Sequence, residues 1–373
     1  MLGRKRTGDE SVFFNIVKNL ALVDEVNEYS LFIDKRSSEE ITAIVQSLGI
    51  EGKNNFRLVM LPAKNKFTWN FWMLPRYLRR YPVDVYHTQY IVPFFVPRDI
   101  KIVTHIHDVS FHAYPQYISW KDRFFLDALI PRSLKRADKI IAVSEFTKRE
   151  IMERYAIGEG KISVVLNALS DDFLRYEPCD PERSARVRSK YALPERYILY
   201  VGTLQPRKNI PALIGAFARI CEKLPDMQLV IVGNRKGHHY DTGIDAAIRE
   251  NNLSDRIVFP GYVDQEDVFA VMQGALAFVF PSLYEGFGLP VLEAMSQRVP
   301  VVASDIPPLR EVAVDAALFA DTRDLAEFSE ILYTISTVAK VREELITSGI
   351  KQMQRFSWRA SAKRLRDVYV SLI

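Results

Sequence analysis

The sequence contains little cysteine, no long apolar run and no export signal at its start. Cys179 and Cys221 are the only cysteines among 373 residues, and their spacing matches neither a zinc site nor a redox motif. No apolar run approaches the ~20 residues that a membrane-spanning helix needs, and the opening residues MLGRKRTGDES have no apolar signal-peptide centre. We therefore expect a cytoplasmic protein with free thiols.

Motifs typical of several other protein classes are absent as well. A nicotinamide-dependent dehydrogenase would need G-x-G-x-x-G after its first strand, and the sequence has no such run. It has no D-x-D triplet and no cluster of His and carboxylates with metal-ligand spacing, so we expect neither a metal nor a cofactor. The net charge is +4, and basic residues are not concentrated in a nucleic-acid-binding module, so we expect no nucleic-acid partner.

The charge that is present is unevenly distributed. Residues 1–170 carry a net charge of +6, residues 171–355 carry −5 and residues 356–373 carry +3. A basic first half suits a protein that meets anionic substrates or lipid headgroups, whereas scattered surface charge would give the same numbers. Both interpretations stay open at this stage.

Short β-rich runs alternate with helical patterns along the whole chain. Most of these runs are continuously apolar, as in strands buried on both faces, and helical connections of about a dozen residues make the sheets parallel. The predicted strands are residues 28–34, 56–62, 83–89, 101–108, 139–145, 161–168, 197–203, 227–233, 256–262, 276–282, 299–304 and 316–321. Because a single core stops growing near ~250–300 residues, we predict an α/β protein of two doubly wound domains.

The polar segment 171–197 has three prolines and no strand pattern, so we interpret it as the connection between the domains. Residues 355–373 combine helical apolar spacing with positive charge, and we expect this helix to cross back onto the first domain. The first domain is therefore residues 1–170 plus 356–373, and the second is residues 171–355.

The first domain begins unusually for a doubly wound fold. A polar loop, GRKRTGDES, leads directly into a predicted helix at residues 12–23, with no strand before it. Either the first strand is missing, or Met1 and Leu2 are its remnant. Loss of a central strand would expose two sheet edges and lower stability.

The stretch FVFPSLYEGFGLPVLEAMS joins an apolar strand to a helix and carries two carboxylates. Its glycines let the backbone approach a ligand closely, and Pro290 suits the first turn of a helix, whose free N–H groups can meet a phosphate. Glu285 on the loop and Glu293 in the helix could accept hydrogen bonds from paired sugar hydroxyls. Alternatively, Glu285 is a turn residue and Glu293 is a solvated helix residue.

A second strand-turn-helix stretch, YVGTLQPRKNIPALIGAF, places two adjacent cations at a strand end. Arg207 can make a planar forked contact with a diphosphate, and Lys208 adds a point charge. Cations placed in advance would stabilise the negative charge that grows when the bond to a diphosphate breaks. The alternative is a solvated helix start with Asn209 as its N-cap.

Together with GYVDQEDV, these motifs resemble those of the retaining, two-domain GT-B glycosyltransferases of family 4, in which Glu285 and Glu293 would form the ends of the E-x7-E motif. THIHDVSF and PRSLKRADKIIAVSEFTKREI resemble the mannosyltransferase-type members. The likeness covers nearly the whole chain but departs from the family at the missing first strand. It implies two domains that face a cleft.

The resemblance also implies roles for individual residues. Arg207 and Lys208 would hold the donor diphosphate, Glu285 would bind the transferred sugar and His107 would reach that sugar from the first domain. The remaining donor-binding residues would be Thr203, Val263 through its backbone at the base, Gly286, Phe287, Gly288, Leu289, and Glu293 at the ribose. On the acceptor side, Asp108 would orient His107 or cap a turn, and the loop at Thr7 and Gly8 is a weaker candidate because Asp9 would repel a diphosphate. Ser144 is expected to be a helix N-cap rather than a ligand.

The resemblance implies transfer of a hexose, mannose from GDP-mannose, to a glycan or lipid-linked glycan with retention of configuration. The sequence identifies no pair of carboxylates suited to double displacement. The resemblance implies the mechanism favoured for the family, attack from the face that the diphosphate leaves, and we adopt it as a hypothesis. A nucleotide-sugar-binding protein without turnover, or an enzyme that uses a UDP-sugar, would share the same donor-site residues.

The segment of residues 64–81, KNKFTWNFWMLPRYLRRY, interleaves aromatic and basic residues. Such a mixture suits the headgroup layer of a membrane, and contact there would fit a lipid-linked acceptor at the inner membrane face. A core helix with a basic outer face would have the same composition, so both interpretations stay open.

Overall fold

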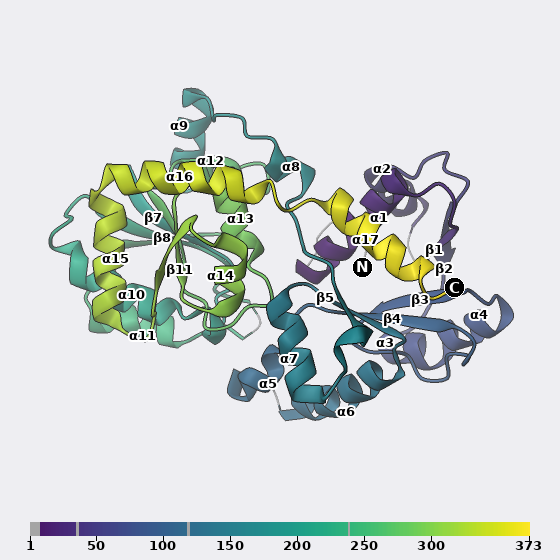
Figure 1. Ribbon diagram of the computed structural model, residues 1–373. Helices are drawn as coiled ribbons and strands as arrows, with labels where there is room; N and C mark the ends of the chain where they lie inside the picture. The colour runs from purple at the N-terminus through teal and green to yellow at the C-terminus, as the bar shows by residue number, and fades with distance from the viewer. Residues whose placement is uncertain (1–7, 35–36, 118–119, 238) are drawn as a thin grey trace. The chain divides into compact units, whose positions relative to one another are not determined.

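The computed structural model describes residues 8–34, 37–117, 120–237 and 239–373 (Figure 1). The chain divides into two compact units. The first joins the chain up to Val109 with Trp120–Ala168 and Ser357–Ile373, and the second joins Ser110–Ser119 with Leu169–Phe356. The predicted division assigned residues 110–119 to the first domain. They belong to the second unit, where the Tyr114 hydroxyl donates a hydrogen bond to the carbonyl of Leu283 (3.2 Å).

The strands of the first unit form two parallel sheets. One pairs β1 (Tyr29–Ile33) with β2 (Phe56–Met60), and the other has the order β3 (Val85–Gln89), β4 (Lys101–Ile106), β5 (Lys139–Ala142) and β6 (Ile162–Val164). β4 and β5 are almost entirely buried, as their continuous apolar runs predicted.

The first unit also contains the helices on either side of these strands. They are α1 (Gly8–Val23), α2 (Ser38–Leu48), α3 (Lys66–Thr68), the π-helix η1 (Trp69–Met73), α4 (Leu74–Arg80), α6 (Trp120–Arg136), α7 (Glu145–Tyr155), the 3₁₀ turn η3 (Glu159–Lys161) and α17 (Trp358–Val370). Segment 64–81 is therefore helical from Lys66 to Arg80, and it buries Leu74 and Leu78 completely.

The C-terminal helix packs on the first unit, as predicted. α17 lies against α1, and the Arg366 guanidinium donates to the carbonyl of Val23 (3.2 Å). The Ser361 hydroxyl donates to the carbonyl of Leu166 (2.6 Å). The last residues of the sequence thus help to hold its first described helix in place.

The helix at the start of the first unit begins earlier than predicted. α1 spans Gly8–Val23, so Gly8 is helical rather than part of a loop that faces a phosphate. Met1, Leu2 and Thr7 lie outside the described residues, and the missing first strand stays a prediction.

The second unit is built on one six-stranded parallel sheet. Its order is β12 (Ala317–Ala320), β11 (Val301–Ser304), β10 (Ala277–Phe280), β7 (Arg196–Val201), β8 (Met227–Val232) and β9 (Ile257–Gly261). β10 and β11 are buried along their whole length. This order is that of a doubly wound fold, and every strand that the sequence predicted is present in the structure.

Helices cover both faces of this sheet (Figure 1). They are α10 (Ile210–Cys221), α11 (Gly243–Glu250), α12 (Val268–Gln273), α13 (Leu289–Ser296), α14 (Pro307–Ala313), α15 (Leu325–Thr337) and α16 (Ala339–Met353). The second unit also contains the short pieces α5 (Ser110–Ala113), η2 (Pro115–Tyr117) and η4 (Pro206–Lys208). The expected connection at residues 171–197 contains α8 (Asp171–Leu174) and α9 (Pro181–Lys190), and α9 packs on α12. This connection belongs to the second unit, together with the rest of residues 171–355.

Candidate functional site

The order of strands in the second unit reverses direction at β7. β8 and β9 follow on one side, whereas β10, β11 and β12 lie on the other. Ligands of open parallel sheets bind beyond the carboxyl ends of the strands at such a reversal. The loops that leave β7 and β10, residues 202–209 and 281–288, both emerge at this point.

The loop after β7 presents its two cations from a single tight turn. η4 spans Pro206–Lys208, and Asn209, with φ of 54°, ends the turn in the left-handed region before α10 begins. The Leu283 N–H donates to the carbonyl of Arg207 (2.8 Å), so the loops after β7 and β10 are hydrogen-bonded to each other. The Thr203 carbonyl accepts from the Tyr200 hydroxyl (2.8 Å), which holds the start of the loop against its own strand.

Arg207, Lys208 and Glu285 come together at this place. The Lys208 ammonium forms a close ion pair with Oε1 of Glu285, and one guanidinium nitrogen of Arg207 lies 3.5 Å from Oε2. Arg207 also donates to the carbonyl of Tyr284 (3.1 Å), and the Lys208 ammonium lies 4.8 Å from the centre of the Phe280 ring. Lys208 and Glu285 are buried, whereas the Arg207 side chain is one-quarter exposed.

The charge balance of this cluster favours an anion. Burial raises the pKa of the Glu285 carboxyl, but the charges of Lys208 and Arg207 outweigh burial and hold that pKa below its usual value. Glu285 is therefore ionised at neutral pH. Two cations face one carboxylate, which leaves one net positive charge at the strand ends.

The turn between β10 and α13 depends on glycine. Gly288 has φ of 109°, a conformation that side chains with a Cβ rarely adopt, and an added Cβ would lie 2.5 Å from a methyl group of Leu309. Pro290 occupies the first turn of α13, as the sequence predicted. Residues Gly286, Phe287, Gly288 and Leu289 thus connect Glu285 directly to the N-terminus of α13, where the first N–H groups have no partner within the helix.

Glu293 lies one turn into α13, and its environment differs from that of Glu285. The residue is half-buried, and among the described residues its carboxylate has no hydrogen bond or ion pair. Burial alone raises the pKa of Glu293 to about 7. A carboxylate in such a place is costly to ionise without a partner, which is a common property of ligand-binding groups.

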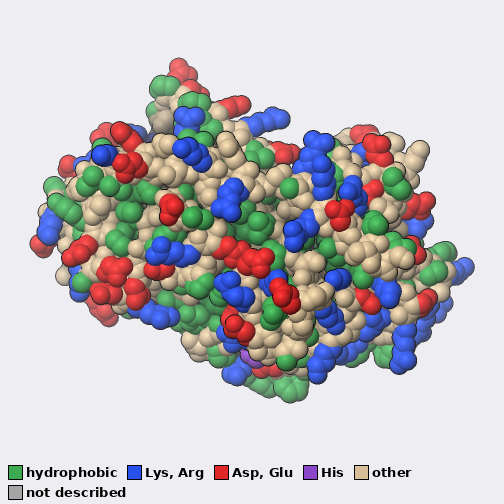
Figure 2. Space-filling view, viewed as in Figure 1, with side chains coloured by type: hydrophobic (Ala, Val, Ile, Leu, Met, Phe, Trp, Pro, Cys, Tyr) green, Lys and Arg blue, Asp and Glu red, His purple; other side chains and the backbone are tan. Residues whose placement is uncertain are grey.

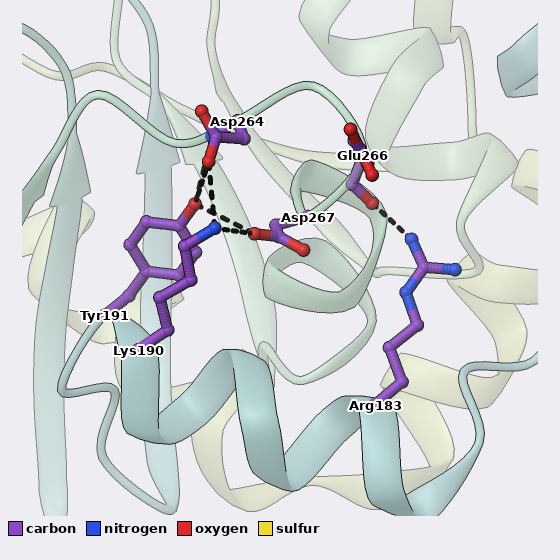
Figure 3. A network of polar contacts seen from close by, with 6 residues as sticks. All are labelled: Arg183, Lys190, Tyr191, Asp264, Glu266 and Asp267. Carbon is purple, nitrogen blue, oxygen red and sulfur yellow. Dashed lines mark hydrogen bonds and ion pairs between the residues drawn. The ribbon is translucent and has the colours of Figure 1, made fainter.

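Val263 is buried in the loop between β9 and α12, and a polar network fixes that loop (Figure 3). The Lys190 ammonium at the end of α9 pairs with Asp264 (2.8 Å) and Asp267 (2.7 Å). The Tyr191 hydroxyl donates to Asp267 (2.9 Å) and accepts from the N–H of Asp264 (3.1 Å). Asp264, the residue after Val263, is thus held through both its side chain and its backbone.

Four of the residues considered in the sequence belong to the first unit. His107 is buried at the end of β4, where its ring stacks on that of His105 at 4.7 Å between centroids, and half-buried Asp108 follows it. Gly8 opens α1. Ser144 accepts a hydrogen bond from the N–H of Thr147 (3.0 Å), which confirms the prediction that it caps α7.

His107 is the end of a row of three histidines, in which His105 and His107 are buried and His87 is half-buried. The parallel rings of His87 and His105 lie 5.6 Å apart, and Nδ1 of His87 shares a hydrogen bond with the Tyr369 hydroxyl of α17 (2.5 Å). Burial, followed by the charge of His107, lowers the pKa of His87 to about 3 and the pKa of His105 well below its usual value. These rings are therefore neutral at physiological pH.

Two polar contacts close to His107 and Val263 were not predicted from the sequence. The bond between His87 and Tyr369 joins residues 282 positions apart, and the contacts of Lys190 and Tyr191 cross about 75 positions. Neither has a local motif. The alternation of histidines at positions 105 and 107 was the available signal for a shared strand face.

Two family profiles together match most of the chain. The profile described as "Glycosyltransferase Family 4" matches residues 22–173, and "Glycosyl transferases group 1" matches residues 183–352. The gap between the two matches, residues 174–182, lies within the predicted connection at residues 171–197. Across the described residues, no helix is long and apolar enough to cross a membrane.

Several of the similar proteins are mannosyltransferases. "O-antigen chain mannosyltransferase B" of Escherichia coli is 31% identical over 372 residues, which is 97% of this chain and 96% of that protein. "O-antigen chain mannosyltransferase RfbU" of Salmonella typhimurium is 27% identical over 261 residues, covering 69% of this chain and 67% of that protein. Among solved structures, sucrose-phosphate synthase from Thermosynechococcus elongatus superposes with a TM-score of 0.70 at 21% identity, covering 93% of this chain and 99% of that one. That likeness shows the GT-B fold.

Proposed function

The chain belongs to the GT-B glycosyltransferases of family 4, and on that premise we propose that it transfers mannose from GDP-mannose to a glycan with retention of configuration. The names of its relatives support mannose as the sugar and an O-antigen glycan as the acceptor. The observation that carries the proposal is the meeting of Arg207, Lys208 and Glu285 where the strand order reverses.

Arg207 and Lys208 neutralise the departing diphosphate in this mechanism. The bond between the anomeric carbon and the phosphate oxygen breaks, and the electron pair leaves with the diphosphate, so negative charge grows beside the two cations. Because these cations are fixed in advance, they stabilise the transition state more than the bound donor. The acceptor hydroxyl attacks the same face of the sugar and gives its proton to the leaving phosphate oxygen. This positive charge serves in place of a metal ion, so we expect EDTA to leave the rate unchanged.

The other donor-site residues position the nucleotide sugar. Glu285, kept ionised by its neighbours, accepts hydrogen bonds from the sugar hydroxyls, and Glu293 accepts them from the ribose. The backbone N–H groups at Gly286, Phe287, Gly288 and Leu289 line the sugar and phosphate, and the turn at Thr203 lies under the diphosphate. The backbone of Val263 contacts the base.

The first unit supplies the acceptor side. We propose that His107 contacts the transferred sugar and that Asp108 orients His107. Gly8 is a weak candidate for acceptor contact because it begins a helix. We propose that the acceptor is a lipid-linked glycan, reached by an enzyme that works in the cytoplasm against the inner membrane face with segment 64–81 toward the lipid.

The direct test is Lys208→Ala assayed for mannose transfer. The variant should lose at least ~100-fold in kcat, since it removes a charge that acts on the transition state. Lys351→Ala is the matched control, because Lys351 is exposed on α16 and far along the chain from both loops. Near-normal transfer by Lys208→Ala would refute the assignment.

A panel of nucleotide sugars separates this proposal from its rivals. A ligand that binds only the folded protein raises the melting temperature, so GDP-mannose should shift it more than UDP-sugars do. A larger rise in melting temperature with a UDP-sugar would identify that UDP-sugar, rather than GDP-mannose, as the donor. Binding without release of nucleotide diphosphate, in the presence of acceptor, would instead identify a binding protein without turnover.

A further inference from the structure

A connected row of aromatic rings lies on the surface of the first unit. Phe67 and Phe71 stack with 4.1 Å between ring centroids, Phe71 and Phe94 stack at 4.7 Å, and the rings of Phe94 and Phe95 lie 6.2 Å apart. The two ends of the row, Phe67 and Phe95, are 62% and 63% exposed. Residues far apart in the chain thus build one apolar surface that water covers.

Helix α6 extends this surface. Trp120 and Phe124 stand one turn apart near its start and are 76% and 70% exposed, and neighbouring Phe125 is 60% exposed. Arg132, two turns after Phe125 on the same side of the helix, places its guanidinium 3.6 Å from the centre of the Phe94 ring. The aromatic rings of α6 and the row at Phe94 therefore lie along one continuous stretch of surface, which we call the aromatic face.

The exposed rings are not needed to hold the fold together. The helical segment from Lys66 to Arg80 contributes Leu74 and Leu78 to the core, where both side chains are completely buried. Trp72 of the same segment is 70% exposed. Large aromatic side chains in contiguous exposed patches are uncommon in soluble proteins and mark contact sites. The aromatic face therefore has a function outside the folded core.

The charges beside these rings are basic. Segment 64–81 has no acidic residue, and Arg76, Arg79 and Arg80 are exposed on α4. Along the lower edge of the first unit, beside α6 and α4, Figure 2 shows hydrophobic side chains with Lys and Arg around them. On α6, Asp127 is paired with Arg123 at 3.4 Å. Aromatic rings bordered by cations match the headgroup layer of an anionic bilayer, where rings sit between water and acyl chains.

We propose that the aromatic face docks the protein on an anionic lipid bilayer, with the rings of Trp72, Trp120, Phe124 and Phe125 in the headgroup layer. This proposal rests on the proposed function, because a lipid-linked acceptor would be presented at the bilayer surface. It adds α6 and the Phe94–Phe95 turn to the stretch that sequence alone indicated. The docking itself is independent of catalysis.

The test is flotation of the whole protein with vesicles of phosphatidylcholine, with and without phosphatidylglycerol. The protein should float with the anionic vesicles at low salt and stay behind with the neutral ones. Arg79→Gln/Arg80→Gln should lower the partition coefficient by about fivefold for each charge removed. Phe124→Ser/Phe125→Ser should lower it further, and Val26→Ser, a residue 89% exposed in the same unit, should leave it unchanged.

Tryptophan quenching locates the contact. Brominated lipid should quench the fluorescence of the protein on anionic vesicles. Trp72→Phe/Trp120→Phe should remove most of that quenching, because Trp358 is buried and Trp69 is only partly exposed. Equal flotation of the wild type and both multiple variants, or no flotation with anionic vesicles, would overturn the proposal. A dimer in sedimentation that Phe124→Ser/Phe125→Ser dissociates would assign the face to a second copy instead.

The outcome can be separated from the fate of the proposed function. Both surface variants should transfer mannose to a soluble oligosaccharide acceptor at the wild-type rate. Loss of flotation with transfer retained supports the docking face, whereas flotation without any transfer leaves the face standing and removes the mannosyltransferase assignment.

Discussion

Replacing Glu293 by Gln should stabilise the protein without donor while weakening its hold on the donor. Burial raises the pKa of Glu293 from 4.5 to about 7, so the folded protein holds a proton on this group that the unfolded chain has released. Stability therefore falls as pH rises from 4.5 to 7 and stays low above 7. At 1.36 kcal/mol for each pKa unit, the ionised carboxylate costs about 3 kcal/mol at pH 8.

A neutral glutamine of similar shape does not carry this cost. Glu293→Gln should therefore melt roughly 6–12 °C higher than wild type at pH 8, given about 2–4 °C for each kcal/mol in a domain of this size. At pH 4.5 the two proteins should melt within a degree or two of each other. Thermal unfolding followed by circular dichroism across this pH range measures the difference.

Glu330→Gln is the matched control, because Glu330 is exposed on α15 and should change little at either pH. Hydrogen bonds to a charged group contribute about 1.5–3 kcal/mol, so loss of the ribose contacts should weaken donor binding by ~10–100-fold. A Glu293→Gln protein that melts no higher than wild type at pH 8 would refute the buried-carboxylate reasoning, and unchanged donor affinity would refute the ribose assignment.

Two further predictions concern parts of the structure away from the cations. The folded-state pKa values of His87 and His105 lie below the unfolded value of 6.5, so unfolding takes up protons at acidic pH. The free energy of unfolding should therefore fall by up to about 2.7 kcal/mol per pH unit as pH drops below 6.5 toward 4. In chemical unfolding of His105→Gln, the dependence of this free energy on pH should be smaller by one proton, and an equal dependence would contradict the assignment. Lys190→Ala should loosen the loop that carries Val263, because Lys190 pairs with two aspartates of that loop (Figure 3). The KM for the donor should rise several-fold while kcat stays within about twofold. A fall in kcat alone would contradict a positioning role for Lys190.

The sequence predicted most of the fold because its signals are local. Each strand of both units is a short apolar run bounded by turn residues, and burial on both faces follows from that composition. The same holds at the site for Gly288 and Pro290, whose backbone requirements are readable without knowing the neighbours. The helical spacing and charge of residues 355–373 sufficed to predict that α17 returns to the first unit.

Features that depend on distant contacts could not be predicted. Nothing within residues 110–119 shows that they join the second unit, since the bond that places Tyr114 is made with Leu283. The polar composition of residues 181–190 suggested a linker, yet Lys190 becomes structural through two aspartates of another loop. From the sequence, Glu285 and Glu293 were both predicted to bind sugar hydroxyls, with no difference in their ionisation. In the structure, neighbouring cations keep Glu285 ionised, whereas burial alone raises the pKa of Glu293.

The most direct measurement is an NMR determination of the product formed from GDP-α-mannose and a glycan acceptor, with nucleotide release followed in the same tube. The account predicts release of GDP matched by formation of an α-linked mannoside, with both signals lost in Lys208→Ala. A β-linked product, or transfer that continues unchanged in Lys208→Ala, would contradict it.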